Sequence, residues 1–442
     1  MSRIHHTILI AALLALAGAG SLLAQEKPPM RLTLPEAVRL ALRQNPEVQI
    51  ANLDVAESRE DRSIARSALL PQASLGVSDA ATRRNLEAFI GRRIPGFPQH
   101  VGPFQTFQAG PGFSASVFDL TLWRRLEASS HRVTGTRAQE LTVREQTTLM
   151  VVSQYLGCLR AAADAQAAQS RVQLAQALYD QAEELQKQGI STALDTLRSN
   201  VELQNEKQRL IVAETQRKMA LYGLEKLLNL DPHQAVELAD EPSFFSTPQF
   251  GLGESIEDAY LYRPEIKALM AQETAVNLEK RAAGDERLPK VVVDGNWGYQ
   301  GTSAPASIPA YQFQVTLDVP LFTGGRIRAE TAKARIELKK IGRQMEDLRS
   351  QIALEVKTAV EQLNAAQNEV QVANLGVKLA KDEVSDARER FQAGVANNIE
   401  VITAQDALSR ANDNQIAALY RYNQARADLG HATGQIEKLY TH

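Results

Sequence analysis

The sequence contains a single cysteine, Cys158, among 442 residues. One cysteine excludes an internal disulfide and any metal site that needs several cysteine ligands. Aromatic residues make up only 5% of the chain, and the formal net charge is −3. Because nucleic-acid binding requires a basic surface, this charge balance argues against nucleic acid as a partner. The shortages therefore exclude disulfide scaffolds, cysteine-rich metal proteins and most nucleic-acid binders.

Long hydrophobic runs are also missing after the N-terminal segment. No run in the rest of the chain approaches the ~20 apolar residues that a membrane-spanning helix needs. Residues 1–24 combine the positive Arg3, an apolar stretch at 8–16 and small residues at 17–19. This pattern predicts a secretory signal peptide. Since no cysteine stands directly after this segment, we expect an exported protein without N-terminal lipidation. Any membrane that it crosses would have to be crossed by strands.

What the sequence does have is a repeat. Residues 45–71 begin with Asn-Pro-Glu and end with Leu-Leu-Pro, and residues 263–289 begin with Arg-Pro-Glu and end with Arg-Leu-Pro. A proline at the first helical position and a Leu-Pro at the end predict one helix in each block. Farther on, Gly189 and Gly394 open similar segments at an offset of 205 positions. We interpret the chain as a tandem duplication. The expected parts are 1–24 (signal peptide), 25–230 (first repeat), 231–254 (linker), 255–436 (second repeat) and 437–442 (tail).

The segments that precede these glycines carry heptads. Apolar residues recur every seven positions, and a row that is mostly alanine runs beside them, which predicts long helices packed closely and supercoiled. A helix over 124–188 would span ~98 Å, and helices over 46–69 and 192–229 together ~93 Å. One long helix is thus expected to have two shorter partners. The second-half heptad row is Val356, Leu363, Val370, Val377, Val384 and Phe391.

Four segments read as strands, because apolar and polar residues alternate in them with the period of two that strands have. Alternation over 9–11 residues favours a β-barrel that is apolar toward lipid and polar toward its lumen. The alternative is a soluble antiparallel sheet with one face buried on a helix. Four strands cannot close a useful barrel, so the barrel interpretation requires oligomerisation. The expected strands are 72–79, 112–119, 290–300 and 311–321, with loops at 80–110 and 301–310.

These features together resemble the TolC-type outer-membrane efflux family, as do the turns LQKQGISTALDTL and FQAGVANNIEVITAQ and the segment LFTGGRIRAE at 321–330. The resemblance covers nearly all of the mature chain. It implies a mainly α fold with a small β part: long coiled-coil hairpins and four strands per chain, assembled as a homotrimer. The trimer would form a 12-strand β-barrel continued by a 12-helix α-barrel tunnel across the periplasm.

The resemblance also implies a function and partners. The protein would be the passive exit duct of a tripartite efflux or type I secretion system in the outer membrane of a Gram-negative bacterium. It would meet outer-membrane lipid, a periplasmic adaptor protein and an inner-membrane transporter of the RND or ABC type. The implied adaptor contacts are the turn residues Gly189, Ile190, Ser191, Thr192, Gly394, Val395 and Ala396. Each glycine also has a simpler interpretation, as the positive-φ residue at a helix end.

Glu400 and Asp195 match the acids that ring the narrow periplasmic entrance in that family. Three carboxylates around one axis would attract cations and repel one another. The alternative is two solvated acids near a helix N-terminus, where the helix dipole favours them. The gate departs from the family pattern. Phe391 and Ala396 stand where the resemblance implies a latching Tyr and Arg, and Thr403 stands where it implies a second acid. Arg388 or Arg390 could replace the latch, or closure could rest on packing.

Residues of the strands have expected roles as well. Asp294 and Asp318 would line the lumen, and Trp297, Tyr299, Tyr311 and Phe322 would form the aromatic girdles at the membrane interfaces. No paired nucleophile, phosphate loop or metal cluster is visible, so we expect no enzyme activity and no cofactor or metal. Two rival classes remain open: a secreted or periplasmic coiled-coil structural or adhesin-type protein without a barrel, and a periplasmic adaptor.

Overall fold

The structure is a computed structural model that describes residues 29–189, 192–240, 252–393, 395 and 398–441. The expected signal peptide lies outside the described residues. The chain divides into two compact units, one of residues 1–49, 144–262 and 353–442 and one of residues 50–143 and 263–352. We call them the hairpin unit and the sheet unit. In the described part of the chain, no helix is long and apolar enough to cross a membrane.

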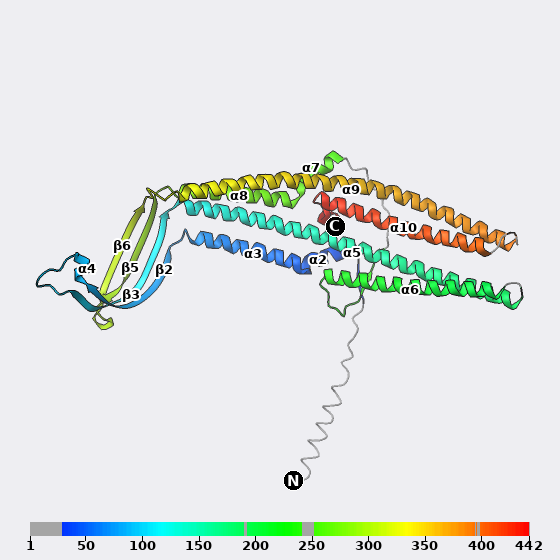
Figure 1. Ribbon diagram of the computed structural model, residues 1–442, viewed down its shortest axis with the longest axis horizontal. Helices are drawn as coiled ribbons and strands as arrows, with labels where there is room; N and C mark the ends of the chain where they lie inside the picture. Colours follow the sequence, from blue (N-terminus) through cyan, green and yellow to red (C-terminus); the bar gives the residue numbers. More distant parts are fainter. Residues whose placement is uncertain (1–28, 190–191, 241–251, 394, 396–397, 442) are drawn as a thin grey trace, which may run out of the picture. The chain divides into compact units, whose positions relative to one another are not determined.

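One order of elements occurs twice along the chain: a helix, two strands, a long helix and a returning helix (Figure 1). This is the order that the repeat predicts, although the exact boundaries of the two repeats stay a prediction. The first set is α3 (Pro46–Ser67), β2 (Gln72–Asn85), β3 (His100–Phe118), α5 (Leu120–Lys187) and α6 (Ala193–Leu227). The second set is α8 (Pro264–Asp285), β5 (Lys290–Gly301), β6 (Ile308–Asp318), α9 (Arg326–Gln392) and α10 (Asn398–Ala432).

The heptad rows form the core of the hairpin unit. Val356, Leu363 and Val370 of α9 are at most 3% exposed. Near the end of α9, Val384 and Ala387 form a buried cluster with residues of α10. In α5, Val151 is fully buried, as the same spacing predicts. The small residues beside each row let the helix axes approach, so the pattern stabilises two helical hairpins, α5–α6 and α9–α10. The side chain of Phe391 lies outside the described residues.

In the sheet unit, helices α3, α5, α8 and α9 extend from one end of a four-stranded antiparallel sheet, whose strand order is β2-β3-β5-β6 (Figure 1). The helices meet closely where side chains are small. A Cβ added to Gly135 of α5 would lie 3.6 Å from both the Ala268 carbonyl and the Ala271 Cβ of α8. This close approach explains why a glycine occurs inside a long helix.

The strands of the first repeat are longer than expected, and the prediction of a loop over 80–110 was wrong in part. Residues 80–85 belong to β2 and 100–110 to β3, with a short helix α4 (Leu86–Ile90) between the strands. The glycines and prolines here suggested a loop. A Cβ on Gly110, however, would lie 2.4 Å from the Trp297 carbonyl, and one on Gly298 would lie 2.2 Å from the Ala109 carbonyl. These glycines permit close contact between β3 and β5 rather than a turn.

The inter-repeat linker has a structural role that the sequence did not reveal. Strand β1 (Met30–Leu32) pairs in parallel with β4 (Val236–Leu238). The Tyr155 hydroxyl of α5 lies 2.9 Å from the Leu32 carbonyl and 2.9 Å from the Asp240 carboxylate. The pKa of Tyr155 is raised, first by burial and then by the hydrogen bond to Asp240. The linker therefore fastens the start of the described chain to α5. The remaining short elements are α2 (Leu34–Gln44), α7 (Leu252–Tyr262), the 3-10 turn η1 (Ala304–Ala306) and α11 (Ile436–Tyr440).

Candidate functional site

The sheet has one apolar and one polar face. The register places Val293 opposite Val315 and Trp297 opposite Tyr311 on the apolar face. Val315, Trp297, Tyr299 and Tyr311 are 71%, 60%, 52% and 73% exposed. A row of large apolar side chains left open in one chain is a surface that lipid or another protein must cover. Phe322, which is 90% exposed, follows the opposite end of β6 from Tyr311.

The polar face holds the two expected lumen residues. Asp294 lies opposite Ser114 of β3 and Gln314 of β6, and Asp318 lies opposite Lys290. Asp294 also lines a hollow of about 570 Å³ on this face, whereas Asp318 does not. The other polar residues that line the hollow are Gln72, Ser74, Ser114, Asn296, Gln312 and Gln314. A polar face of this kind suits contact with water.

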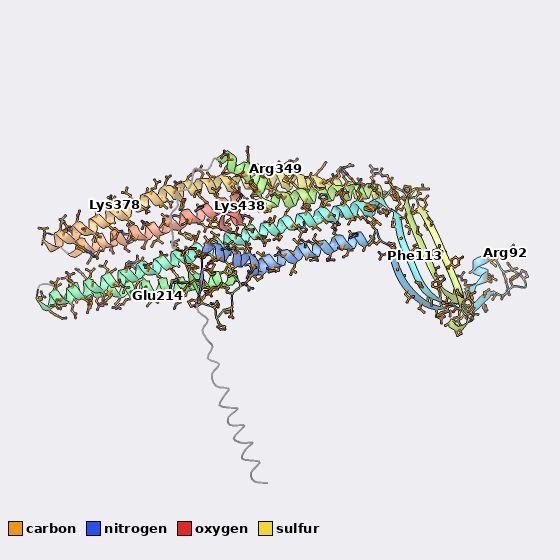
Figure 2. All side chains as sticks on the ribbon, turned by 180° about the vertical axis from the view of Figure 1, so that it is seen from behind. Arg92, Phe113, Glu214, Arg349, Lys378 and Lys438 are labelled. Carbon is orange, nitrogen blue, oxygen red and sulfur yellow. The ribbon has the colours of Figure 1, made fainter. Side chains whose placement is uncertain are left out.

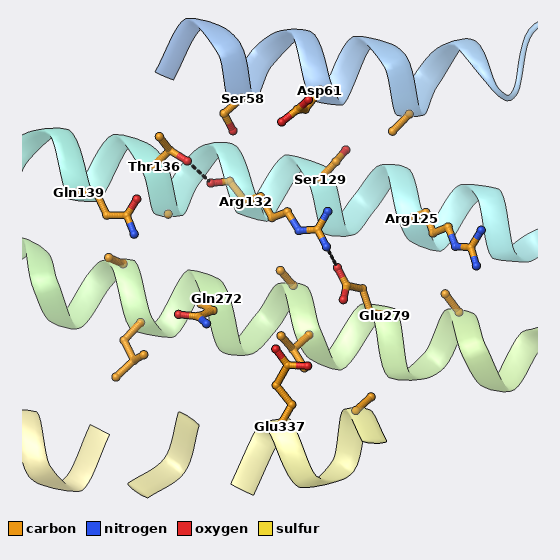
Figure 3. Close-up of a pocket in the computed structure, with 18 of the residues that line it drawn as sticks. Ser58, Asp61, Arg125, Ser129, Arg132, Thr136, Gln139, Gln272, Glu279 and Glu337 are labelled. Atoms are coloured by element: carbon orange, nitrogen blue, oxygen red, sulfur yellow. Dashed lines mark hydrogen bonds and ion pairs between the residues drawn. The ribbon is translucent and has the colours of Figure 1, made fainter. Parts of the chain in front are cut away.

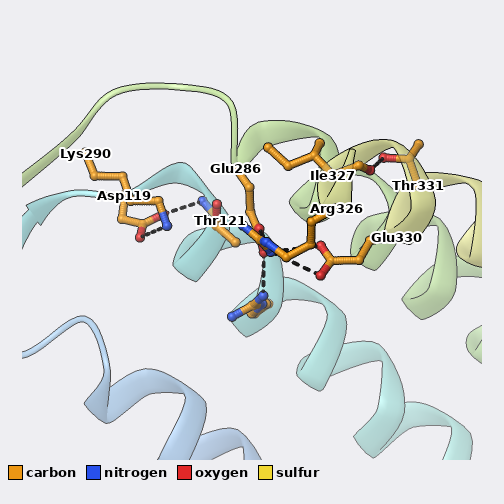
Figure 4. A network of polar contacts seen from close by, with 9 residues as sticks. Asp119, Thr121, Glu286, Lys290, Arg326, Ile327, Glu330 and Thr331 are labelled. Atoms are coloured by element: carbon orange, nitrogen blue, oxygen red, sulfur yellow. Dashed lines mark hydrogen bonds and ion pairs between the residues drawn. The ribbon is translucent and has the colours of Figure 1, made fainter. Parts of the chain in front are cut away.

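An ion-pair network joins the helices where they meet the strands (Figure 4). Glu286, at the end of α8, accepts hydrogen bonds from Arg125 Nη2 at 2.9 Å and from Arg326 Nη1 at 2.5 Å. The Glu286 side chain is only 10% exposed. Nearby, Lys290 Nζ lies 3.2 Å from Asp119 Oδ2. The network connects the ends of α5, α8, α9 and two strands. The sequence did not indicate this network, because no local spacing relates residues 125, 286 and 326.

A large groove lies between α3, α5, α8 and α9 in the sheet unit, with a volume of about 1680 Å³ (Figure 3). Arg132 of α5 and Glu279 of α8 form an ion pair across one wall. Other charged residues that line it include Asp54, Asp61, Arg125, Glu286, Lys333 and Glu337. This mixture of both signs of charge suits a hydrated groove and provides no focused binding site.

The turns between the long helices hold the expected contact residues. Gly189 has φ +75, and no atom lies within 4 Å of the position of an added Cβ. Thr192 is the N-cap of α6, and Val395 is 70% exposed. The predicted contact residues Ile190, Ser191, Gly394 and Ala396 lie outside the described residues. The positive φ accounts for Gly189 as a helix end, and an adaptor contact at these turns stays a prediction.

Asp195 has a defined local role. Its Oδ2 accepts hydrogen bonds from the Thr192 hydroxyl at 2.6 Å and from the Thr192 N–H at 3.2 Å. Thr192 Oγ1 in turn accepts from the Asp195 N–H at 3.3 Å, which completes a capping box. Asp195 also lines a cavity of about 280 Å³ together with Ile399 and Ile402 of α10. Asp195, one of the two acids expected at the gate, therefore caps its own helix.

Glu400 lies in the first turn of α10, and its Oε2 is 3.7 Å from Arg390 Nη2 at the end of α9. The two side chains are 46% and 60% exposed, so the pair is weak and screened by solvent. Arg390 is one of the two arginines that sequence reasoning offered as a substitute latch. Thr403 donates its hydroxyl to the Ile399 carbonyl of its own helix.

The two helical hairpins of the hairpin unit are joined by a polar cluster that the sequence did not indicate. Arg171 Nη1 of α5 lies 2.9 Å from Asp413 Oδ1 and 3.0 Å from Ser409 Oγ, both on α10. Its Nε lies 3.4 Å from Glu206 Oε2 of α6. The Glu206 side chain is only 6% exposed, whereas that of Asp413 is 49% exposed. Arg171 thus connects three helices through one guanidinium group.

Comparison with known proteins now decides the family. A sequence profile of the outer membrane efflux proteins matches residues 37–230 and 255–435, which is most of the chain. The chain belongs to the outer membrane efflux protein family. The two matched segments correspond to the two sets of elements described above.

Proteins similar in sequence to this chain include secretion and export proteins. The alkaline protease secretion protein AprF of Pseudomonas aeruginosa is 23% identical over 423 residues, which cover 92% of this chain and 85% of AprF. The pyoverdine export outer membrane protein OpmQ of Pseudomonas putida is 24% identical over 414 residues, with 91% and 85% covered. The crystal structure of the Campylobacter jejuni outer membrane channel CmeC has a TM-score of 0.78 at 18% identity, covering 91% of this chain and 86% of CmeC.

Family membership confirms the mainly helical TolC-like fold and the location in the outer membrane of Gram-negative bacteria. The family consists of export channels and not of enzymes, as the sequence predicts. The chain is therefore an outer-membrane efflux or secretion channel protein. The individual gate, tip, lumen and girdle residues stay predictions.

Proposed function

We propose that three copies of this chain form the exit duct of a tripartite export system. The duct would combine a 12-strand β-barrel in the outer membrane with a 12-helix tunnel in the periplasm. The observation that carries the proposal is the two-faced sheet, whose outer strands β2 and β6 are both edges. An open strand edge cannot lie in lipid, because its N–H and C=O groups would lack partners. Pairing β2 of one copy with β6 of the next satisfies both edges.

The hairpin unit supports the same assembly. Its contacts run from α6 to α5 through Gln154, from α5 to α10 through Arg171, and from α10 to α9 through Arg421. The two outer helices α6 and α9 each carry exposed apolar side chains. Those of α6 include Leu197, Val201 and Ile211, and those of α9 include Val372, Leu375 and Leu379, all at least 54% exposed. Contact between α6 of one copy and α9 of the next would bury both rows.

The turns α5–α6 and α9–α10 would then form the periplasmic end, where an adaptor protein docks and couples the duct to an RND or ABC transporter. Glu400 would face the narrow entrance, close to Arg390, while Asp195 mainly caps α6. Transport would be passive: solute passes a water-filled duct whose polar wall includes Asp294 and Asp318. The energy would come from the inner-membrane partner.

The first test is the mass of the detergent-extracted particle by native mass spectrometry, followed by conductance in planar bilayers. We expect a trimer that forms pores. Glu400→Gln should change the ratio of cation to anion permeability more than Asp195→Asn, because Asp195 is held by Thr192. A monomer extracted without detergent, or a trimer without conductance, contradicts the proposal. Equal effects of the two substitutions would contradict the assignment of Glu400 alone as the gate acid.

A further inference from the structure

The β2–β3 hairpin extends beyond the rest of the sheet and carries an unusual concentration of arginine. The β3–β5 ladder ends at the pair Phe107–Gly301, whereas the β2–β3 ladder continues to the pair Asn85–His100. Six residues of β2 lie past this level, which is ~20 Å at the rise of a strand. Arg83, Arg84, Arg92 and Arg93 lie in this extension, with Glu87 as the one acid between residues 83 and 100. We call residues 83–100 the arginine tip.

The positive charge of the arginine tip is exposed and mostly unpaired. All four arginines are exposed, and Figure 2 shows Arg92 beyond the ends of the strands. Arg83 Nη2 contacts His100 Nε2 at 2.6 Å. Within the described ranges, no ion pair involves any of the four. The β5–β6 hairpin, by contrast, has no charged residue between 301 and 308. The whole chain carries a net charge of −3, so this is a local excess of cations.

The position of the tip relative to the apolar face indicates what it meets. Arg83 is six residues after Val77 on β2, which puts its side chain on the face of the exposed apolar band. The ladder shifts register between Thr82 and Arg84, but the extra residue lies on β3, so the alternation along β2 continues. His100, the hydrogen-bond partner of Arg83, pairs with Asn85 and is therefore on that face too. Between the band and Arg83 lies Asp79, whose carboxylate accepts a hydrogen bond from Gln105 Nε2 at 2.6 Å. Exposed apolar groups accompany the cations, among them Ile90, Phe97 and Val101, at 42%, 63% and 43% exposed. The order along β2, from apolar residues to polar and charged residues, matches the order of layers from the centre of a membrane outward: hydrocarbon, then a polar and charged headgroup layer.

We propose that the arginine tip binds the phosphate groups of glycolipid headgroups in the outer leaflet of the outer membrane. This inference rests on the proposed function, which puts the strand tips on the outer side. Guanidinium groups bind phosphate oxygens through paired N–H donors, and clustered basic residues recognise anionic headgroups. Arg83, Arg92 and Arg93 make these contacts around the outside of the barrel. Arg84 leaves the opposite strand face and points toward the lumen side.

The test uses the full-length trimer in detergent and a lipopolysaccharide that carries only lipid A and inner-core sugars. Binding is measured before and after the lipid phosphates are removed with hydrofluoric acid. Three variants are compared with the unmodified protein: R83Q/R92Q/R93Q, R84Q, and R59Q/R217Q/R335Q. The last variant removes the same charge from exposed helix positions that form no ion pair within the described ranges. We expect R83Q/R92Q/R93Q to weaken binding by about 10- to 100-fold. R84Q and the helix variant should bind as the unmodified protein does.

Four outcomes overturn the inference. R83Q/R92Q/R93Q binds the lipid as tightly as the unmodified protein does, or the unmodified protein binds the dephosphorylated lipid as tightly as the intact one. Alternatively, the helix variant loses as much binding as R83Q/R92Q/R93Q, or inorganic phosphate at the same concentration as the lipid displaces it completely. The last would identify a site for free anions. Conductance is measured on the same preparations. If every variant forms pores and none differs in lipid binding, only this inference fails. If the unmodified protein forms no pore, the proposed function fails, whatever the lipid result.

Discussion

Replacing Arg171 with Met should loosen the contact between the two helical hairpins by an amount that the burial of its partners determines. Glu206 Oε2 is buried and makes no hydrogen bond, so its interaction with Arg171 Nε at 3.4 Å compensates its lost hydration. Breaking a buried ion pair costs about 3–5 kcal/mol. Arg209 remains beside the other oxygen of Glu206, which lowers the expected cost of R171M to about 2–3 kcal/mol.

The assay is hydrogen exchange by mass spectrometry on the detergent-solubilised trimer. A loss of about 2–3 kcal/mol in local opening free energy corresponds to exchange about 30- to 150-fold faster. The faster exchange should be confined to α6 around Glu206 and α10 around Asp413. Lys207→Met, on an exposed position of α6, is the matched control and should leave exchange unchanged.

A double-mutant cycle separates the two partners of Arg171. The coupling of Arg171 to Glu206, measured with E206Q, should exceed its coupling to Asp413, measured with D413N. The reason is that the Asp413 side chain is 49% exposed, and pairs at that exposure contribute only about 0–1 kcal/mol. The reasoning is refuted if R171M changes exchange less than about threefold, or if the Asp413 coupling is the larger one.

Three further predictions follow from particular environments. Val315→Arg, on the apolar face of the sheet, should cost about 2–4 kcal/mol of barrel stability and lower the yield of trimer in outer-membrane fractions, while Gln314→Arg on the polar face should not. Burial raises the pKa of Asp164; the charge of Arg160 lowers this pKa and the charge of Asp413 raises it further. The ionised carboxylate therefore destabilises the folded state, and D164N should raise the thermal midpoint at neutral pH. This advantage should disappear as the pH falls below about 3.9, where the carboxyl is protonated in both the folded and the unfolded state. An equal advantage at low pH would contradict this sign. Burial raises the pKa of the Cys158 thiol to about 12, so this thiol should be alkylated only when the protein unfolds. A cysteine introduced at an exposed position of α5 by S170C should react at once. Fast alkylation of Cys158 in the native protein would show that α5 opens around residue 158.

Much of the fold could be predicted because its signals are local. The heptad rows around Val356 and Val151 required close helix packing, and both residues are fully buried. The alternation from Val291 to Gln300 required a strand with two unlike faces, and the register bears this out. The prediction of a loop over 80–110 was wrong in part, because glycine occurs both in turns and where two strands approach closely. Gly110 suggested a turn, but it lies against Gly298 of the neighbouring strand.

The candidate site was less accessible to sequence reasoning. Asp195 and Glu400 occupy matching positions in the two repeats, yet one completes a capping box and the other lies near Arg390. The residue that corresponds to Thr192 in the second repeat is Asn397, which lies outside the described residues. The capping contacts of Asp195 depend on the backbone at Thr192, and sequence spacing alone did not show them.

By itself, the sequence determined the repeat, the types and order of the main elements, and the separation of apolar from polar strand faces. Each of these depends on residues a few positions apart, whose relation follows from the geometry of a helix or a strand. Only the tertiary structure decided the contacts of Glu286 with Arg125 and Arg326, and of Arg171 with Glu206 and Asp413. Those partners are 161, 40, 35 and 242 positions apart, and no local period relates them. Such pairs form because folding brings the elements that carry them side by side.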